Sequence, residues 1–413
     1  MRILTGRAAA ARVGALAARE NQYAAIEPAV RRIVTDVRRK GDRALRRYAA
    51  RWDSLPAALP LRVPESQLRA SWDAAPPALR TALRRAASNI RRFAEWQQPK
   101  SWTRSRDAIR LGQIVRPLDS VGCYVPGGRY PLVSTLLMTV IPAQVAGVPN
   151  IRVVSPNPHP DVLAAAAMLG VKEFYRVGGA QAVAALAYGT ETIPRVDKVV
   201  GPGSKYVTVA KKLVAFGCAI DFLAGPTEAV ILSDKGTPEY LAADLVAQAE
   251  HDPDALVIFI TTSSRLAKAV TARATVLSAN NPTAREALRN QGVALVASSR
   301  EQALNWTNAI ACEHVTLSRR DLPALRNAGS VFVGDYSAQS AGDYASGTNH
   351  VLPTAGAARF RGGLSVLDFV KIITVQELSS TGLRRIAPII ETLAEAEGLA
   401  AHAESVSVRC RRA

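Results

Sequence analysis

The stretch Ile151–Tyr188, IRVVSPNPHPDVLAAAAMLGVKEFYRVGGAQAVAALAY, contains the pattern that decides the fold class. A short β-branched run at Ile151–Ser155 is followed by an Ala-rich helical segment at Asp161–Leu169. The same order repeats at Phe174–Val177 and Ala180–Tyr188. Strands that alternate with helices imply crossover connections, which produce a mostly parallel sheet covered by helices. The stretch therefore predicts an α/β fold.

The alternation continues on both sides of this stretch. Further elements of the first series are predicted at Val121–Val125, Lys198–Val200 and Ala219–Leu223 for strands and Ser204–Phe216 for a helix. After the turn at Gly225-Pro226, a second series has predicted strands at Ala229–Leu232, Ala255–Thr261, Val293–Ala297, His314–Leu317 and Val331–Val333, with helices at Ser264–Ala272 and Arg300–Ala309. Two successive series predict two Rossmann-like units with mostly parallel sheets.

Helical segments are predicted at both ends of the chain, at Val30–Tyr48, Pro64–Trp96 and Gln376–Val408. We expect four parts: an N-terminal helical arm (1–20), a first Rossmann-like domain (21–112 and 229–365), a second one (113–228), and a C-terminal helical segment (366–413). The C-terminal segment is rich in apolar residues, so it needs a surface to pack on.

The composition excludes several classes of protein. The chain has 413 residues, of which 48% are hydrophobic, enough for two or more globular cores. Its longest apolar stretch, Ser134–Val148, is interrupted by Pro142 and is too short to span a bilayer. Residues Met1–Glu20 are rich in Ala and Arg, as in a transit peptide, but they lack an apolar core and a cleavage site. We expect a helical arm there and no membrane-spanning segment.

The cysteines and the charge limit the location and the partners. Cys123, Cys218, Cys312 and Cys410 are far apart and form no C-x-x-C pair, which argues against a thiolate zinc site or a disulfide framework and predicts a reducing cytoplasm. The net charge of +18 makes a nucleic-acid partner worth testing. However, the basic residues near the N-terminus alternate with apolar ones, as in an amphipathic helix, and no zinc finger, aromatic RNP motif or basic zipper accompanies them. The sequence therefore argues against specific nucleic-acid binding. A nucleic-acid-binding module without catalytic activity is kept as the alternative to an enzyme.

The run Ala247–Pro253, AQAEHDP, ends a segment with helical periodicity. Gln248 and His251 share one helical face, close enough for an amide oxygen and an imidazole nitrogen to reach one ion. A helix end with a solvated histidine is the alternative. If Asp343 and His402 joined them, the set would suit an exchangeable, catalytic Zn²⁺, because it contains no thiolate. Spacing alone does not establish such a set.

Two further patterns suggest chemistry. Glu313-His314 begins a predicted strand, where both side chains can serve one site if the backbone bends; His314 would be a general base and Glu313 would activate water. A pair of residues on the protein surface is the alternative.

Glycine-rich turns follow three predicted strands, at Tyr124–Gly128, Gly178–Gln181 and Gly201–Ser204. Nucleotides bind at such turns in open α/β sheets, but none is a full G-x-G-x-x-G, so ordinary turn glycines also explain them.

These motifs together resemble the histidinol dehydrogenase family over nearly the whole chain. The most specific pieces are Gly178-Gly179-Ala180-Gln181-Ala182, Gln248-Ala249-Glu250-His251-Asp252, Ser346-Gly347-Thr348-Asn349-His350-Val351-Leu352-Pro353, and Gly363-Leu364-Ser365-Val366 with Asp368-Phe369. The family reaction is the NAD-dependent, two-step oxidation of L-histidinol to L-histidine through a bound aldehyde, at the end of histidine biosynthesis. The resemblance therefore implies a zinc- and NAD-dependent oxidoreductase.

The resemblance also implies residue roles by position. The positions that match the family's ligands for one Zn²⁺ per subunit are Gln248, His251, Asp343 and His402. Those that match the catalytic pair are Glu313, for water activation, and His314, for removal of the hydroxyl proton. Those that match the cofactor-binding positions are Tyr124, Gln181 and Ser204. Those that match the substrate-binding positions are Thr227, Gln248, His251, His314, Asp343, Glu397 and His402. A homodimer is implied, in which the C-terminal segment of one subunit completes the partner's site.

Four positions depart from the family pattern. Ser204 stands where Asn is usual, Thr227 where Ser is usual, Cys312 where Pro is usual and Gln339 where Glu is common. Thr227 keeps its hydroxyl group. Ser204 is expected to weaken a cofactor contact, and Gln339 to remove a charge near the substrate amine. These changes leave one alternative within the family, a paralogue that oxidises another amino or acidic alcohol.

Overall fold

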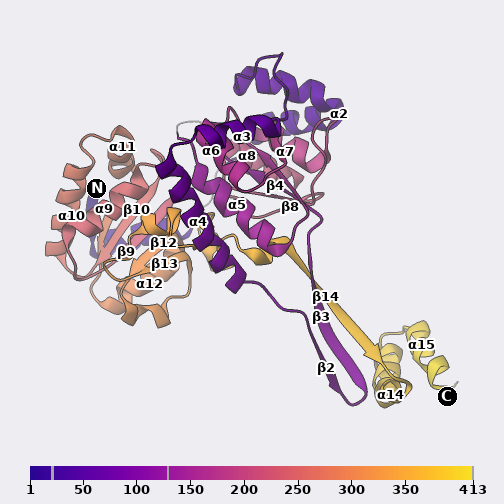
Figure 1. Cartoon of the computed structure of the whole chain (residues 1–413). Helices are drawn as coiled ribbons and strands as arrows, with labels where there is room; N and C mark the ends of the chain where they lie inside the picture. Colours follow the sequence, from indigo (N-terminus) through magenta and orange to yellow (C-terminus); the bar gives the residue numbers. More distant parts are fainter. Residues whose placement is uncertain (20–22, 128–129, 412–413) are drawn as a thin grey trace. The chain divides into compact units, whose positions relative to one another are not determined.

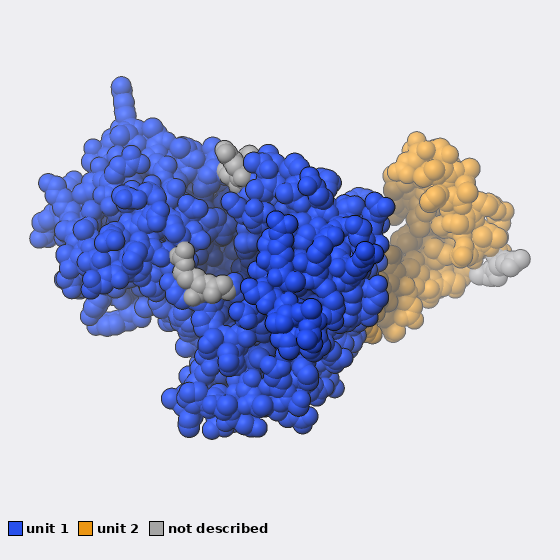
Figure 2. Space-filling model, turned by 90° about the horizontal axis from the view of Figure 1, so that it is seen from above, with its two compact units in different colours: residues 1–97, 119–369 blue, residues 98–118, 370–413 orange. Residues whose placement is uncertain are grey.

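The structure, a computed structural model, describes residues 1–19, 23–127 and 130–411. It divides into two compact units, of which unit 1 contains residues 1–97 and 119–369 and unit 2 contains residues 98–118 and 370–413 (Figure 2). Unit 1 holds two parallel sheets, here called sheet A and sheet B, and unit 2 holds one antiparallel sheet, sheet C. The predicted α/β fold with mostly parallel sheets is confirmed.

Sheet B is formed by the first predicted series, in the strand order β6-β5-β4-β7-β8. Its strands are β4 (Ser120–Tyr124), β5 (Asn150–Val154), β6 (Glu173–Tyr175), β7 (Lys198–Val200) and β8 (Ala219–Ile220). Its helices are α5 (Val133–Ala146), α6 (Pro160–Met168), α7 (Gly179–Tyr188) and α8 (Lys205–Val214). The core on one face joins α7 and α8 to α2 (Glu27–Trp52). All neighbouring strands run parallel, so their carboxyl ends meet at one edge.

Sheet A is formed by the second series, in the order β1-β11-β10-β9-β12-β13. Its strands are β1 (Arg2–Thr5), β9 (Glu228–Leu232), β10 (Leu256–Thr261), β11 (Val293–Val296), β12 (Cys312–Leu317) and β13 (Ala328–Val333). Its helices are α1 (Gly6–Ala17), α9 (Pro238–Ala249), α10 (Ser264–Leu277), α11 (Pro282–Asn290) and α12 (Arg300–Ile310). One core packs α1 and α12 on one face, and another packs α9, α10 and α11 on the opposite face (Figure 1). Covered on both faces, the central strands β9 and β10 are buried along their whole length.

The structure differs from the expectation for the N-terminal arm. Residues Arg2–Thr5 form the edge strand β1, which pairs in parallel with β11, and the helix α1 begins after it at Gly6. The edge of β11 offers unpaired backbone groups, and a short segment can satisfy them without any pattern of its own. The prediction of a helical arm was therefore wrong for residues Arg2–Thr5, which form a strand.

Unit 2 also contains strands that the sequence analysis missed. Sheet C has the order β14-β3-β2, with β2 (Trp102–Arg106), β3 (Ile109–Pro117) and β14 (Val370–Leu378). The tail was predicted to be helical from Gln376, but β14 continues to Leu378, because it pairs with β3 along nine residues. The helices α14 (Ser380–Ala396) and α15 (Ala400–Arg411) follow. Pairing between segments more than 250 residues apart leaves no local signal. The four-part domain division stays a prediction.

The remaining elements belong to unit 1. They are α3 (Glu65–Ala74), α4 (Pro77–Trp96), α13 (Gln339–Tyr344) and the short 3-10 helices η1 (Arg319–Ala324), η2 (Ala357–Arg359) and η3 (Val366–Phe369). No helix in the described ranges is both long and apolar enough to cross a bilayer. The four cysteines are free thiols, of which Cys123, Cys218 and Cys312 are buried.

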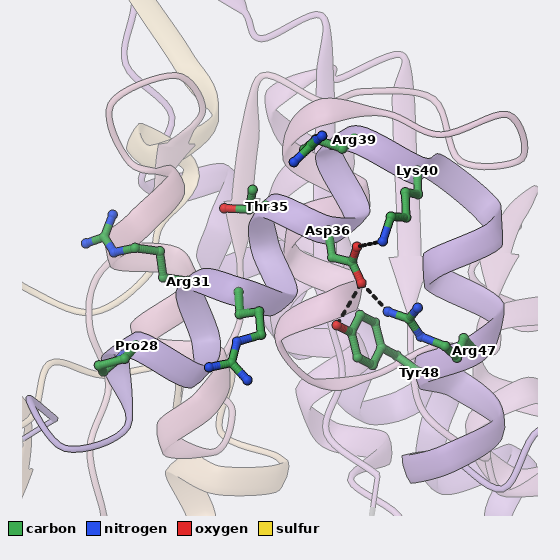
Figure 3. Close-up of a pocket in the computed structure, with 9 residues that line it drawn as sticks. Pro28, Arg31, Thr35, Asp36, Arg39, Lys40, Arg47 and Tyr48 are labelled. Carbon is green, nitrogen blue, oxygen red and sulfur yellow. Dashed lines mark hydrogen bonds and ion pairs between the residues drawn. The ribbon is translucent and has the colours of Figure 1, made fainter.

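The arginine-rich segment near the N-terminus lies on α2, which is kinked at Gly41. Its basic residues surround a surface pocket, and Asp36 lies among them (Figure 3). Asp36 pairs with Lys40 at 2.6 Å, forms an ion pair with Arg47, and accepts a hydrogen bond from the Tyr48 hydroxyl at 3.0 Å. Part of the positive charge is therefore balanced within the helix itself. The prediction against specific nucleic-acid binding stays a prediction.

Candidate active site

A cavity of about 590 Å³ in unit 1 is lined by residues from both parallel sheets. Sheet B contributes turns that follow its strands, including Ser204 at the start of α8. Sheet A contributes the opposite edge: Thr227 lies just before β9, and Glu313 and His314 are the second and third residues of β12. The carboxyl edge of sheet B and the amino edge of sheet A therefore share one cavity.

The last turn of α9 and the short helix α13 contribute the other predicted residues. The helix α9 returns the chain to the amino edge of sheet A, so Gln248 and His251 lie at that edge. Asp343 comes from α13 and lines the same cavity. Far apart in sequence, five residues that the sequence analysis singled out for metal binding or catalysis thus surround one space. His251 is solvent-exposed, whereas Gln248 and Asp343 are buried.

Glu313 and His314 form a buried pair. The His314 Nδ1 atom lies 3.6 Å from Glu313 Oε2 and 3.3 Å from the backbone carbonyl of Glu228, and its Nε2 lies 3.4 Å from Asp343 Oδ1. Burial raises the pKa of Glu313 above its usual range. Burial lowers the pKa of His314, but the charges and contacts of Glu313 and Asp343 outweigh it and raise that pKa to about 10. Proton-exchanging groups with environments of this kind are common at catalytic sites.

Gln248 and Asp343 provide a test of whether a cation fits here. The Gln248 amide nitrogen donates to Asp343 Oδ2 at 3.2 Å, which leaves its oxygen, Oε1, pointing elsewhere. That oxygen is buried and has no hydrogen-bond partner in the described part of the chain. A buried acceptor without a partner is costly, and a bound cation would satisfy it. Together with the Asp343 carboxylate and the His251 imidazole, it forms a donor set that suits Zn²⁺.

The other two predicted residues, Glu397 and His402, belong to unit 2. Glu397 is the C-cap residue of α14, and His402 is the third residue of α15. Both side chains are exposed, and neither is among the residues that line the cavity of unit 1. Within the described ranges, no three His, Cys, Asp or Glu side chains are grouped to hold a metal. Unit 1 alone supplies two such side chains and one amide.

Of the three residues predicted to bind the cofactor, only Ser204 lines the cavity. Its hydroxyl makes no capping bond to α8, so it is free to contact a ligand. Tyr124 and Gln181 are buried and are not among the lining residues. The Tyr124 hydroxyl accepts the Gly179 amide at 2.9 Å, and the Gln181 amide donates to Asp53 at 3.2 Å. These two side chains therefore shape the turn before α7.

Some residues of the site were missed by sequence reasoning. His350, quoted above within a family motif but given no role, lines the cavity. Its Nδ1 donates to the backbone carbonyl of Asp343 at 2.8 Å, and its Nε2 lies 3.3 Å from the Thr135 hydroxyl, so it helps to orient Asp343. Asp53 also lacked a sequence signal, because it follows α2 and meets the α7 turn only in the folded chain.

The four departures from the family pattern lie in different places. Ser204 and Thr227 line the cavity, whereas Cys312 is a buried thiol in the core under sheet A. Gln339 is fully buried, and its amide donates to the Thr316 hydroxyl at 3.0 Å. It is not a lining residue, so the structure gives no support to its expected place near a substrate amine.

Comparisons with known proteins agree on one family. The sequence model of the family described as histidinol dehydrogenase matches residues 16–410. Histidinol dehydrogenase of Methanothermobacter thermautotrophicus is 46% identical over 92% of each chain, and that of Syntrophotalea carbinolica is 44% identical over 97% of this chain and 96% of its own. A crystal structure of histidinol dehydrogenase from Elizabethkingia anophelis is similar with a TM-score of 0.94 and 36% identity, covering 100% of this chain and 98% of the other.

Proposed function

The chain belongs to the histidinol dehydrogenase family of oxidoreductases, and we propose that it oxidises L-histidinol to L-histidine in two NAD-dependent steps, as the end of histidine biosynthesis. The observation that carries this proposal is the cavity of unit 1, where the buried pair Glu313–His314 lies beside Asp343 and the unpartnered oxygen of Gln248. This arrangement combines a proton-transfer pair with donors for a cation, which supports a metal-assisted oxidation of an alcohol.

Gln248, His251 and Asp343 would hold a Zn²⁺ ion, and His402 from a partner subunit would complete the set. When bound, the ion supplies a Lewis acid for the substrate's nitrogen atoms, and NAD⁺ supplies the hydride acceptor. The amide of Gln248 is a weak ligand, so the metal would exchange more readily than at an all-histidine site. Thr227 and Glu397 would contact the substrate beside these ligands.

The chain's own residues would handle the protons. A cation held by Asp343 and Gln248 would oppose the carboxylate charges that raise the pKa of His314, and the neutral imidazole would then accept the substrate hydroxyl proton at Nε2, because its Nδ1–H is directed at the Glu228 carbonyl. Glu313, whose buried environment raises its pKa, then takes a proton from water as the water attacks the bound aldehyde. After His314 has released the first proton to solvent, it removes the hydroxyl proton of the hydrate in the second oxidation.

The cofactor would bind at the carboxyl edge of sheet B. Ser204 and Gly203 line the cavity at the N-terminus of α8, where backbone amides and the helix dipole favour a phosphate group. Tyr124 and Gln181 support the neighbouring turn before α7 and would contact the cofactor from there.

A homodimer would explain the surface of unit 2. Its exposed large apolar side chains in the described residues are Trp102, Leu111, Ile372, Ile373, Val375, Ile389, Leu393, Leu399 and Val408. An exposed apolar set of this size on one small unit is typical of an interaction surface. A second copy of the chain would cover it, and the same contact would bring Glu397 and His402 to the partner's cavity. The cytoplasmic location, predicted from the cysteines, is part of the same proposal.

The experiment that tests the function is NADH production. The purified protein is incubated with L-histidinol and NAD⁺, then treated with a chelator and finally given Zn²⁺ back. We expect histidine and two NADH per histidinol, loss of activity on chelation and recovery with zinc. No NADH from L-histidinol with the zinc-loaded protein would refute the proposal.

One observation keeps a second function open. Ser204 stands at the cavity where the family usually has Asn, so the cofactor or substrate contacts there are altered. A paralogue that oxidises another amino or acidic alcohol would reduce NAD⁺ with such an alcohol at a higher kcat/KM than with L-histidinol. A panel of alcohols assayed under the same conditions separates the two functions.

A further inference from the structure

A buried ion pair, Arg19–Glu228, lies behind the Glu313–His314 pair. The guanidinium of Arg19 binds both carboxylate oxygens of Glu228, with Nε to Oε1 at 2.7 Å and Nη2 to Oε2 at 2.5 Å. The side chains are only 15% and 7% exposed. A bidentate pair at this depth has strict geometry, because the planar guanidinium matches the carboxylate at both ends.

Arg19 also joins two helix ends to this carboxylate. Its Nη1 donates to the backbone carbonyls of Leu16, at 2.6 Å, and Ile310, at 2.7 Å. Leu16 lies in the last turn of α1, and Ile310 is the last residue of α12, two residues before β12 begins at Cys312. The carboxylate of Glu228 in turn accepts the amide of Ala355 at 3.0 Å. One side chain therefore ties the start of β9 to α1 and to the entry of β12.

The backbone of Glu228 touches both members of the proposed catalytic pair. Its N–H donates to Glu313 Oε2 at 2.9 Å, and its C=O lies 3.3 Å from His314 Nδ1. The second contact directs Nδ1 to the Glu228 carbonyl, so that Nε2 faces Asp343. The position of this one peptide segment thus sets the carboxylate of Glu313 and the orientation of His314.

We infer that Arg19 and Glu228 are positioning residues for the reaction, which hold the first residue of β9 so that its backbone aligns Glu313 and His314. This inference rests on the proposed function for its kinetic effect. Neither side chain lines the cavity, so neither is expected to bind substrate or cofactor. A shift of about 1 Å at reacting groups can lower the rate by about 100-fold while leaving binding nearly unchanged.

The test compares Arg19→Lys with a matched control, Arg300→Lys. Lysine keeps the charge of Arg19 but cannot bind both Glu228 oxygens and the two helix-end carbonyls at once. Arg300 also binds carboxylates from a half-buried position, Asp234 at 2.9 Å and Asp321 at 3.0 Å, but at the opposite edge of sheet A. Both variants lose part of a polar network, and only one of these networks touches Glu313 and His314.

We expect Arg19→Lys to lower kcat for L-histidinol about 10- to 100-fold, with the KM values for L-histidinol and NAD⁺ changed less than about threefold. Arg300→Lys should keep kcat within about twofold of wild type, assayed where both variants are folded. Methylguanidinium should restore part of the activity of Arg19→Ala, because it fills the space of the missing group. Equal kcat losses in both lysine variants, or none in Arg19→Lys, would overturn the inference.

Crystal structures of the wild type and both lysine variants give a result that does not depend on activity. In Arg19→Lys, we expect the contacts from Glu228 to Glu313 and His314 to lengthen beyond hydrogen-bonding distance; in Arg300→Lys they should persist. If the wild type does not oxidise L-histidinol, the proposed function fails, and these structures alone decide whether Arg19 and Glu228 position Glu313 and His314. If Arg19→Lys does not fold, Glu228→Gln takes its place with the same expected split between kcat and KM. Unchanged contacts in the variant would refute the positioning role.

Discussion

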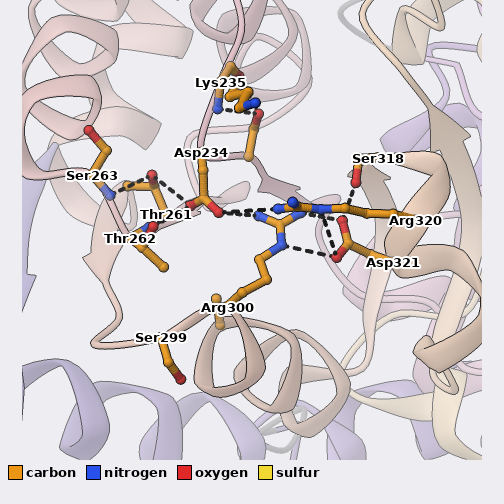
Figure 4. A network of polar contacts seen from close by, with 12 residues as sticks. Asp234, Lys235, Thr261, Thr262, Ser263, Ser299, Arg300, Ser318, Arg320 and Asp321 are labelled. Carbon is orange, nitrogen blue, oxygen red and sulfur yellow. Dashed lines mark hydrogen bonds and ion pairs between the residues drawn. The ribbon is translucent and has the colours of Figure 1, made fainter.

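Sheets A and B of unit 1 share one architecture but use opposite edges. At the carboxyl edge of sheet B, glycine-containing turns such as Gly201–Ser204 lead into the cavity. At the carboxyl edge of sheet A, Asp234, Arg300 and Asp321 form a network of ion pairs instead (Figure 4). The residues with proposed catalytic roles lie at the amino edge of sheet A, where open α/β sheets do not usually bind ligands.

The difference shows that the fold class does not by itself place the site. In sheet A, Arg300 at the start of α12 reaches Asp234 after β9, and the Thr262 amide after β10 donates to Asp234 at 2.7 Å. These bonds satisfy the polar groups that would otherwise receive a ligand. In sheet B the Gly201 amide donates to Asp221 at 2.7 Å, but the residues that follow it, Gly203 and Ser204, line the cavity. The chemistry therefore depends on which side chains end each strand.

The largest expected effect concerns the amino edge of sheet A. His314→Asn should slow both oxidation steps about 100- to 10,000-fold, because a general base is lost from each. Glu313→Gln should impair oxidation of histidinaldehyde far more than the first hydride transfer, because water activation matters only after the aldehyde forms. Single-turnover kinetics with each substrate measure the two steps. Equal slowing of both steps in Glu313→Gln would mean that the two residues act as one unit.

The next effect concerns the metal and the assembly of the site. His251→Ala and His402→Ala should each lose activity and zinc together, because each removes a nitrogen that the Gln248 amide cannot replace. Mixing the two inactive dimers should restore about a quarter of the wild-type activity after subunit exchange, since half the dimers would be mixed and each would have one intact site. Metal analysis and activity after exchange measure this. No recovery despite exchange would place the whole site within one chain.

A smaller effect concerns the turn Gly201–Ser204 at the carboxyl edge of sheet B. Gly201 has a φ of +112°, and a Cβ there would overlap the carbonyl oxygen of Tyr124. Gly201→Ala should therefore displace the turn, at a cost of about 1–3 kcal/mol, and weaken NAD⁺ binding about tenfold. Gly217→Ala is the control, because a Cβ at Gly217 meets nothing within 4 Å. Titration of NAD⁺ binding in both variants checks the prediction, which fails if they bind equally well.

The smallest effect on activity concerns the ion-pair network of Arg300 at the carboxyl edge of sheet A. Arg300→Gln should lower the free energy of unfolding by about 1–3 kcal/mol and leave kcat nearly unchanged. Burial raises the pKa of Asp321, but the contacts with Arg300 and Ser318 outweigh it and lower that pKa below its usual range. A lowered folded-state pKa contributes stability above about pH 4 that is lost as the pH falls below it.

The stability difference between wild type and Arg300→Gln should accordingly be constant near neutral pH and shrink in acid. Denaturant unfolding at several pH values measures it. A difference that grows on acidification would show that the network does not depend on ionised carboxylates.

Local patterns predicted most of unit 1. Strand boundaries such as β7, Lys198–Val200, agree with the structure because buried parallel strands are short β-branched runs between Ala-rich helices. The helix predicted before Gln248 and His251 ends at Ala249, so Gln248 lies in its last turn and His251 follows it, instead of the two sharing a helical face; both line the cavity. Sheet C was missed, because β3 pairs with β14, which lies far away in the sequence, and local patterns do not show such a pairing.

The sequence by itself determined the two α/β series, the family, and the candidate residues that local motifs contain, because these follow from short-range periodicity and from the spacing of side chains. The tertiary structure alone decided that Asp343 and Glu313 share a cavity with Gln248, that Tyr124 and Gln181 are buried behind their turn, and that Arg19 supports Glu228. Such contacts join segments from distant parts of the chain, and their geometry depends on how whole sheets and helices pack. No local pattern encodes it.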